Sequence, residues 1–337
     1  MNKFYLLLCI LGIIATAHAQ TDVVDDILNA SKPKREYVAY TFKTTRVICG
    51  HSVETTKKNS LDFRISHHFG DIATPNAAHT LAGFYAISDI LFSFEYGILD
   101  DLTVGIMGSK GAGPMQELYS GFVKYRALKQ TKDFKFPMTI TFFGNACVSG
   151  MKTDPFTGVA FKDEQAGAAH RFSYTLQAML AVKATDWLSI QLSPTFLWRN
   201  YVDNNIGKYG PDANGMFFLG FSARAKFSKR NAFIFEYFFP LSGGTYRQFF
   251  PMIRGIKDAA YYPSLNIGME FETGGHVFHV TLTNTEALVE NDFLPYTHSN
   301  WAQGQFRLGF TISRLFPFGE KGVNPWSGKP KKAKVKG

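Results

Sequence analysis

The chain has 337 residues, of which 45% are hydrophobic and 19% charged, a composition that excludes a wholly disordered protein. Its formal net charge is +9, but Lys3 and the Lys-rich residues 317–337 carry most of it, so the charge does not indicate nucleic-acid binding. After the first 20 residues no stretch of 18 apolar residues exists, so any membrane span must be built from strands.

The N-terminus has the features of an export signal. Lys3 precedes an apolar run that ends at Ile14, and a small-x-small cleavage pattern stands before Gln20. The sequence therefore divides into four predicted parts: a signal peptide over 1–19, an N-terminal segment with a short helix over 20–38, a β-barrel over 39–316 and a basic disordered tail over 317–337.

From residue 61 onward, nearly every segment alternates apolar and polar residues, which is the pattern of a strand with one apolar and one polar face. Many segments reach the roughly 9–11 residues that cross a bilayer obliquely. A weaker segment at 40–50 loses its alternation after Phe42; pairing it with a further strand would raise the count to fourteen. The twelve clear segments are 61–69, 90–98, 102–108, 118–127, 138–148, 171–183, 187–199, 217–227, 233–239, 264–273, 276–284 and 304–316.

Tight and long connections alternate along these strands. Tight links include Asp-Asp near residue 100 and Gly-Gly near residue 274. The intervening links, such as 70–89, 149–170 and 240–263, are mostly long and polar, although the one at 109–117 is short. Bacterial membrane barrels have this asymmetry, and a soluble sandwich, the alternative, has no reason for it. The pattern predicts an all-β fold: an antiparallel up-and-down transmembrane β-barrel of about 12 strands with short periplasmic turns and long extracellular loops.

The last segment shows what the alternation implies. Phe306, Leu308 and Phe310 share one face, and Arg307 and Thr311 share the other. A membrane barrel turns the apolar face to lipid, whereas a soluble sandwich buries it. The segment also resembles the aromatic-rich terminal strand that outer-membrane proteins present to the barrel-assembly machinery, which we expect as a partner, although a tail of 21 residues follows it.

Four runs are long enough to be specific: TFKTTRVICGHSVETTKKNSLDFRISHHFGDI, FEYGILDDLTVGIMGSKGAGPMQELYSGFVKYRAL, MEFETGGHVFHVTLTN and SNWAQGQFRLGFTISRLF. They resemble an uncharacterised family, a domain of unknown function, of Bacteroidetes-type outer-membrane β-barrel proteins, and the likeness covers most of residues 36–316. The resemblance implies an outer-membrane barrel and transfers no functional residues.

No residue set indicates an enzyme, a cofactor or a metal site. His276 and His279 are three apart, so on a strand they face opposite sides and cannot share an ion. An envelope lipid hydrolase would need Ser and His within hydrogen-bond reach on the lipid side; the nearest candidates are His298 and Ser299, with His279 on a neighbouring strand. We expect no catalytic residues, and we expect both Cys49 and Cys147 to be free.

The polar faces carry more basic than acidic residues, which biases an open pore toward anions. The leading hypothesis is an outer-membrane, porin-like barrel that passes or binds small, preferentially anionic solutes in contact with outer-membrane lipid; the oligomeric state is left open. The alternative is a plugged structural or surface-interaction barrel, with the helix at 23–28 or the apolar loop 74–88 as the plug. The lumen-facing basic candidates are Arg64, Lys124, Arg126, Arg171, Arg224 and Arg307.

Overall fold

The structure is a computed structural model that describes residues 35–73, 77–111, 115–152, 168–202, 213–241, 249–253 and 256–318. The predicted signal peptide, the predicted helix at 23–28 and nearly all of the predicted tail lie outside these ranges.

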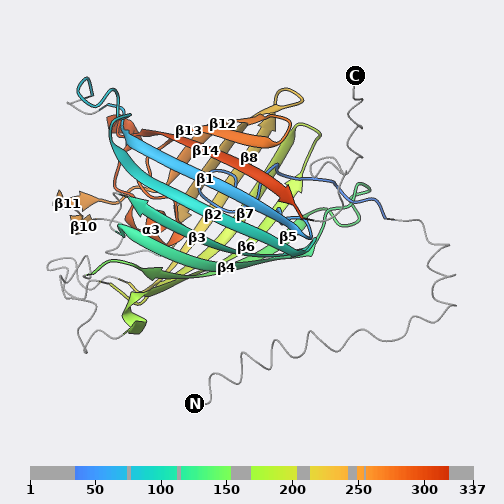
Figure 1. Ribbon diagram of the computed structural model, residues 1–337, viewed down its shortest axis with the longest axis horizontal. Helices are drawn as coiled ribbons and strands as arrows, with labels where there is room; N and C mark the ends of the chain where they lie inside the picture. The colour runs from blue at the N-terminus through green and yellow to red at the C-terminus, as the bar shows by residue number, and fades with distance from the viewer. Residues whose placement is uncertain are drawn as a thin grey trace, which may run out of the picture. The chain divides into compact units, whose positions relative to one another are not determined.

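Within the described residues, twelve antiparallel strands form a closed barrel (Figure 1). Closure comes from the first and last strands, which pair from Ser60 opposite Pro317 to Asp71 opposite Arg307. The predicted twelve-stranded barrel is confirmed, and the fourteen-strand alternative is wrong. The barrel strands are β1 (Ser60–Asp71), β2 (Ile87–Leu99), β3 (Leu102–Gly111), β4 (Glu117–Leu128), β5 (Thr139–Ser149), β6 (Phe172–Lys183), β7 (Leu188–Arg199), β8 (Gly215–Lys226), β9 (Asn231–Pro240), β12 (Leu265–Glu272), β13 (His276–Thr283) and β14 (Arg307–Pro317).

The two ends of the barrel differ in their connections. At the end we call the short-turn end, β2 and β3 are joined through 100–101, and β12 and β13 through 273–275. At the opposite, long-loop end, the β9–β12 connection contains a separate hairpin, β10 (Phe249–Ile253) with β11 (Ile256–Ala260). The β13–β14 connection there contains a short helix, α3 (Glu290–Tyr296). Single 3-10 turns stand at η2 (Ala168–Arg171) and η5 (Trp301–Gln303).

The outward-facing side chains of the wall are mainly apolar, and most of the inward-facing ones are polar. In β4, Tyr119 and Tyr125 are both 51% exposed on the outer face, whereas Ser120 and Lys124 between them are buried. A soluble barrel would have the opposite arrangement, because its core must be apolar. The alternation therefore suits a barrel whose outer surface lies in lipid, and closure of the wall pairs each strand with a neighbour on both sides.

None of the helices that the structure describes is long and apolar enough to cross a bilayer.

Candidate functional site: the barrel lumen

The barrel lumen holds the chain that precedes β1. Residues 41–56, which we call the inner segment, are almost all buried, with Arg46 1% exposed and Val53 fully covered. The weakly alternating segment at 40–50 is therefore not a strand of the barrel wall. The segment turns back on itself, because Val47 N–H donates to the carbonyl of Gly50 and Ser52 N–H donates to that of Thr45, each at 2.9 Å.

The turn of the inner segment is anchored on one carboxylate of the wall. The N–H groups of Ile48, Cys49 and Gly50 donate to Glu236 of β9 at 3.3, 3.0 and 3.0 Å. Three successive amides around one anion form a concave site in which backbone dipoles add to one another. Asn266 of β12 donates to the same carboxylate at 3.1 Å, which holds it in place.

Other parts of the wall bind the same segment on different sides. Lys124 of β4 donates to the carbonyls of Thr45 and Glu54 at 2.8 and 3.1 Å. Gln191 of β7 accepts from Val53 N–H at 2.9 Å and donates to a neighbouring carbonyl of the segment. Since β4, β7 and β9 stand apart around the closed wall, the inner segment crosses the lumen and does not line one side of it.

A second segment fills the lumen from the long-loop end. Every residue of α3 is buried, although this helix belongs to the loop between β13 and β14. Its Asn291 accepts from Asn145 of β5 at 2.9 Å and donates to Ser173 of β6 at 2.8 Å. Tyr296 accepts from Arg199 of β7 at 2.8 Å. The long β13–β14 connection, which the sequence predicts to be an extracellular loop, therefore folds into the lumen. We call its residues 284–299 the inward loop.

The two segments meet at a buried group of charges. Arg46 of the inner segment lies 3.4 Å from Glu290 of the inward loop, and His51 Nε2 lies 3.8 Å from the same carboxylate oxygen. Burial, reinforced by the positive charges of Arg46, Lys124 and Arg64, places the pKa of His51 well below its usual range, so this imidazole is neutral. Burial also raises the pKa of Glu290, and the charge of Arg46 opposes that effect.

Apolar packing supports the inward loop. Phe293 of α3 meets Phe238 of β9 with ring centroids 5.4 Å apart, and Leu288 and Leu294 are buried beside them in the same cluster. On the inner segment, the ring of His51 packs against that of Phe143 of β5, with centroids 4.0 Å apart and planes tilted by 33°. The lumen is therefore packed with both apolar and polar contacts around the charged centre.

The structure disperses the six predicted basic residues over the inner face and pairs most of them with acids. Arg126 contacts Asp101 and Glu54 at the short-turn end. Lys124 and Arg171 instead donate to backbone carbonyls, those for Arg171 belonging to Ser149 and Met151. The remaining contacts are Arg64 with Asp62 at 3.8 Å, Arg224 with Glu270 at 2.6 Å, and Arg307 with Asp71 and Glu286.

The plug candidates from the sequence do not coincide with the segments that fill the lumen. The helix at 23–28 lies outside the described residues. The described part of the loop at 74–88 exposes Leu81, Phe84 and Tyr85, so the prediction that this loop fills the lumen is wrong. Strand alternation places Glu236 on the polar, lumen-facing side, as the structure has it, but sequence reasoning missed its role as an anchor. It also missed Arg46 and Glu290; for Arg46 the only available signal was polar residues in a segment with broken alternation.

The hydrolase candidates do not form the required arrangement. His279 lies inside the lumen beside Glu270 at 3.4 Å, and not on the lipid side. His298 is 3.6 Å from Glu286, while Ser299 accepts from Arg307 at 3.0 Å. Cys49 and Cys147 are both buried and unbonded to each other. Within the described ranges, no three His, Cys, Asp or Glu side chains gather as a metal site.

Comparison with known proteins gives one family and several distant structures. The family described as membrane bound beta barrel domain (DUF5777) matches residues 42–316. No curated protein matches. Among solved structures, the KdgM porin is 9% identical, with a TM-score of 0.41 over 77% of this chain and 99% of that one. The NanC porin gives 9% and 0.42 over 76% and 98%, and the COG4313 outer membrane channel from Pseudomonas putida F1 gives 10% and 0.39 over 78% and 98%.

Proposed function

Because this chain belongs to the family of membrane-bound β-barrel domains, we propose that it is an outer-membrane channel for small solutes whose resting state is closed by the inner segment and the inward loop. Opening requires the inner segment to withdraw toward the short-turn end, which would face the periplasm. Export by the N-terminal signal would bring the chain to this membrane.

The observation that carries this proposal is the polarity of the wall beneath the inner segment. Gln191, Ser193 and Thr141 face inward there and are buried. Burying polar and charged groups in a permanent core gains little over well-packed apolar residues, and often costs stability. A wall that must also contact water when the segment leaves has a physical reason to stay polar.

Polar atoms of buried charged groups that lack a hydrogen-bond partner in the described structure add support. Both carboxylate oxygens of Glu95 and two nitrogens of Arg64 are in this condition. Buried charged groups in proteins are almost always hydrogen-bonded, since desolvation is expensive. A lumen that admits water or polar solutes would satisfy these groups.

A second candidate, a permanently filled structural barrel, is favoured by the apolar packing of Phe293 against Phe238. Single-channel conductance separates the two. The mature protein is compared with a variant that lacks residues 41–56, after circular dichroism and heat-dependent gel mobility show that both have folded. Replacing residues 78–82, a partly to fully exposed stretch of the β1–β2 connection, by a Gly/Ser linker gives the matched control.

The proposal expects rare openings in the unaltered protein, frequent or permanent openings in the deletion variant, and no change in the control. A folded deletion variant without conductance would instead establish the structural barrel. Continuous large conductance of the unaltered protein would overturn the closed resting state. Because Arg64, Arg126, Arg224 and Arg307 are paired with carboxylates, a salt gradient is expected to reveal only weak anion preference in the open lumen.

A further inference from the structure

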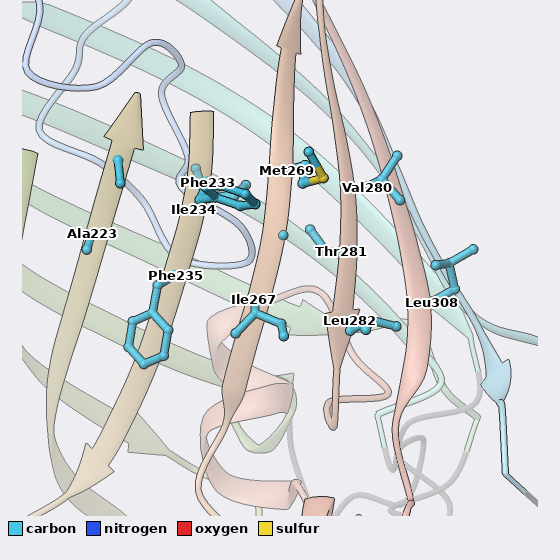
Figure 2. A pocket seen from close by; sticks show the side chains of 12 residues that line it. Ala223, Phe233, Ile234, Phe235, Ile267, Met269, Val280, Thr281, Leu282 and Leu308 are labelled. Atoms are coloured by element: carbon cyan, nitrogen blue, oxygen red, sulfur yellow. The ribbon is translucent and has the colours of Figure 1, made fainter. Parts of the chain in front are cut away.

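The outer wall of the barrel carries an apolar groove of about 540 Å³. It runs across β8, β9, β12, β13 and β14, and Figure 2 shows its side chains coming from these neighbouring strands. The volume lies within the roughly 300–1,000 Å³ of small-molecule sites in proteins.

The groove faces away from the lumen. Phe233 and Ile267, which line it, are 54% and 40% exposed, whereas Asn266 and Glu236, on the opposite face of the same strands, are buried. Ala223 and Ala225 carry too little side chain to fill the space between the larger residues. In a membrane-bound barrel, this hollow opens to the hydrocarbon of the bilayer.

Basic residues stand beyond one end of the groove. The β8–β9 turn, 227–230, exposes Lys229 and Arg230. Arg230 is three residues before Phe233, a separation of about 10 Å along an extended chain. In the same region Phe227 stacks on Phe233 at 4.7 Å, and Trp187 is exposed. Exposed aromatic residues near strand ends are typical of headgroup depth, so the two cations lie where lipid phosphates lie.

We propose that this groove is a binding site for an anionic phospholipid of the leaflet at the short-turn end. One acyl chain lies in the groove between Phe233 and Val280, and the phosphate lies beside Lys229 and Arg230. An acyl chain gains little hydrophobic free energy by moving from bulk lipid to an apolar protein surface, so its binding in the groove must come from close packing. The preference for a negatively charged headgroup comes from the two cations.

A second copy of this chain fits the groove less well. A two-fold dimer at this face would set groove against groove, because the same surface of each subunit meets in such an interface. Two hollows facing each other leave space unfilled, whereas a flexible acyl chain can fill one hollow. Charge complementarity also favours the lipid, since two identical pairs of cations repel each other.

Native mass spectrometry of the delipidated full chain in detergent tests this site, with phosphatidylglycerol and phosphatidylcholine supplied in equal amounts. The groove is filled in the variant Ala223→Phe/Ala225→Phe, and its charges are removed in Lys229→Gln/Arg230→Gln. Ala146→Phe, on the outer face of β5, and Lys132→Gln/Lys135→Gln, in the β4–β5 turn, are matched controls.

The unaltered chain should retain one phosphatidylglycerol in preference to phosphatidylcholine. The variant with the filled groove should lose the retained lipid. In the charge variant, the preference for phosphatidylglycerol over phosphatidylcholine should fall by about fivefold for each cation removed. The controls should behave like the unaltered chain. Unchanged lipid retention by the variant with the filled groove would overturn the proposal. It would also be overturned if the unaltered chain formed dimers that the filled-groove variant did not form, since a second copy would then be the occupant.

Discussion

Glu236 anchors the turn of the inner segment, and Glu236→Gln is the substitution that tests this anchor most directly. The amide has nearly the same shape but keeps only one acceptor oxygen and no charge. In one orientation its NH₂ group replaces Oε2 and faces the N–H of Ile48, and in the other it replaces Oε1 and faces the N–H of Cys49; either way that hydrogen bond is lost. Hydrogen bonds to charged groups contribute about 1.5–3 kcal/mol each, and an orphaned buried N–H costs about 1–3 kcal/mol.

Taking about 3 kcal/mol for the loss at Glu236, the ratio of closed to open barrels should fall by roughly 150-fold. The assay is the open probability of single barrels in planar bilayers, combined with hydrogen exchange at the amides of Ile48, Cys49 and Gly50. The open probability and the exchange rates of these three amides should both rise in Glu236→Gln. The exchange reading does not depend on ion passage, so it tests the anchor even if the barrel conducts poorly.

Glu272→Gln is the matched control, because Glu272 also binds the chain before β1, through Lys43 at 2.7 Å, but is 29% exposed. A partly exposed pair contributes about 0–1 kcal/mol, so the change in open probability should be about fivefold at most. Unaltered conductance together with unaltered amide protection in Glu236→Gln would refute the assignment of Glu236 as the anchor.

Three further predictions concern the centre of the lumen. Arg46→Gln leaves Glu290 buried without its cation and should destabilise the closed form by about 3–5 kcal/mol. The double variant Arg46→Gln/Glu290→Gln should recover part of this lost stability, and denaturant titration of both variants measures the difference. Gly50→Val should raise open probability, because even a Cβ at this position would lie 2.7 Å from the ring of Phe238; Gly50→Ser should have a smaller effect. The pKa of His51 is far below its usual value in the closed form and returns to about 6.5 on release into water, so this group makes acidification below that pH favour opening by up to about tenfold per pH unit. Glu290, whose pKa burial raises, acts in the opposite direction, so His51→Asn should remove the opening at low pH and leave a slope of the opposite sign.

The sequence by itself determined the wall. Strict alternation in segments such as residues 118–127 separates an apolar face from a polar one, because successive side chains of a strand point to opposite sides. Alternating short and long links then order the strands as antiparallel neighbours. These local rules predicted the twelve barrel strands, and the structure differs mainly at their ends: β14 begins at Arg307, whereas the pattern begins at 304.

The separate hairpin β10–β11 was missed, because its ten strand residues form two short runs inside a connection that reads as a polar loop.

Only the tertiary structure decided what fills the lumen. Period-two alternation tells which side a residue faces, but it does not tell which distant segment lies opposite. The amides of Cys49 and Gly50 bind the carboxylate of Glu236, which lies 187 and 186 residues further along the chain. Arg46 contacts Glu290 at a separation of 244 residues. Such contacts exist because barrel closure brings strands from both halves of the chain around one small space. The polar residues of the inner segment have no local pattern that reveals this placement, since the contacts that hold the segment in the lumen are made with Glu236, Lys124 and Gln191 of the wall and with Glu290 of the inward loop.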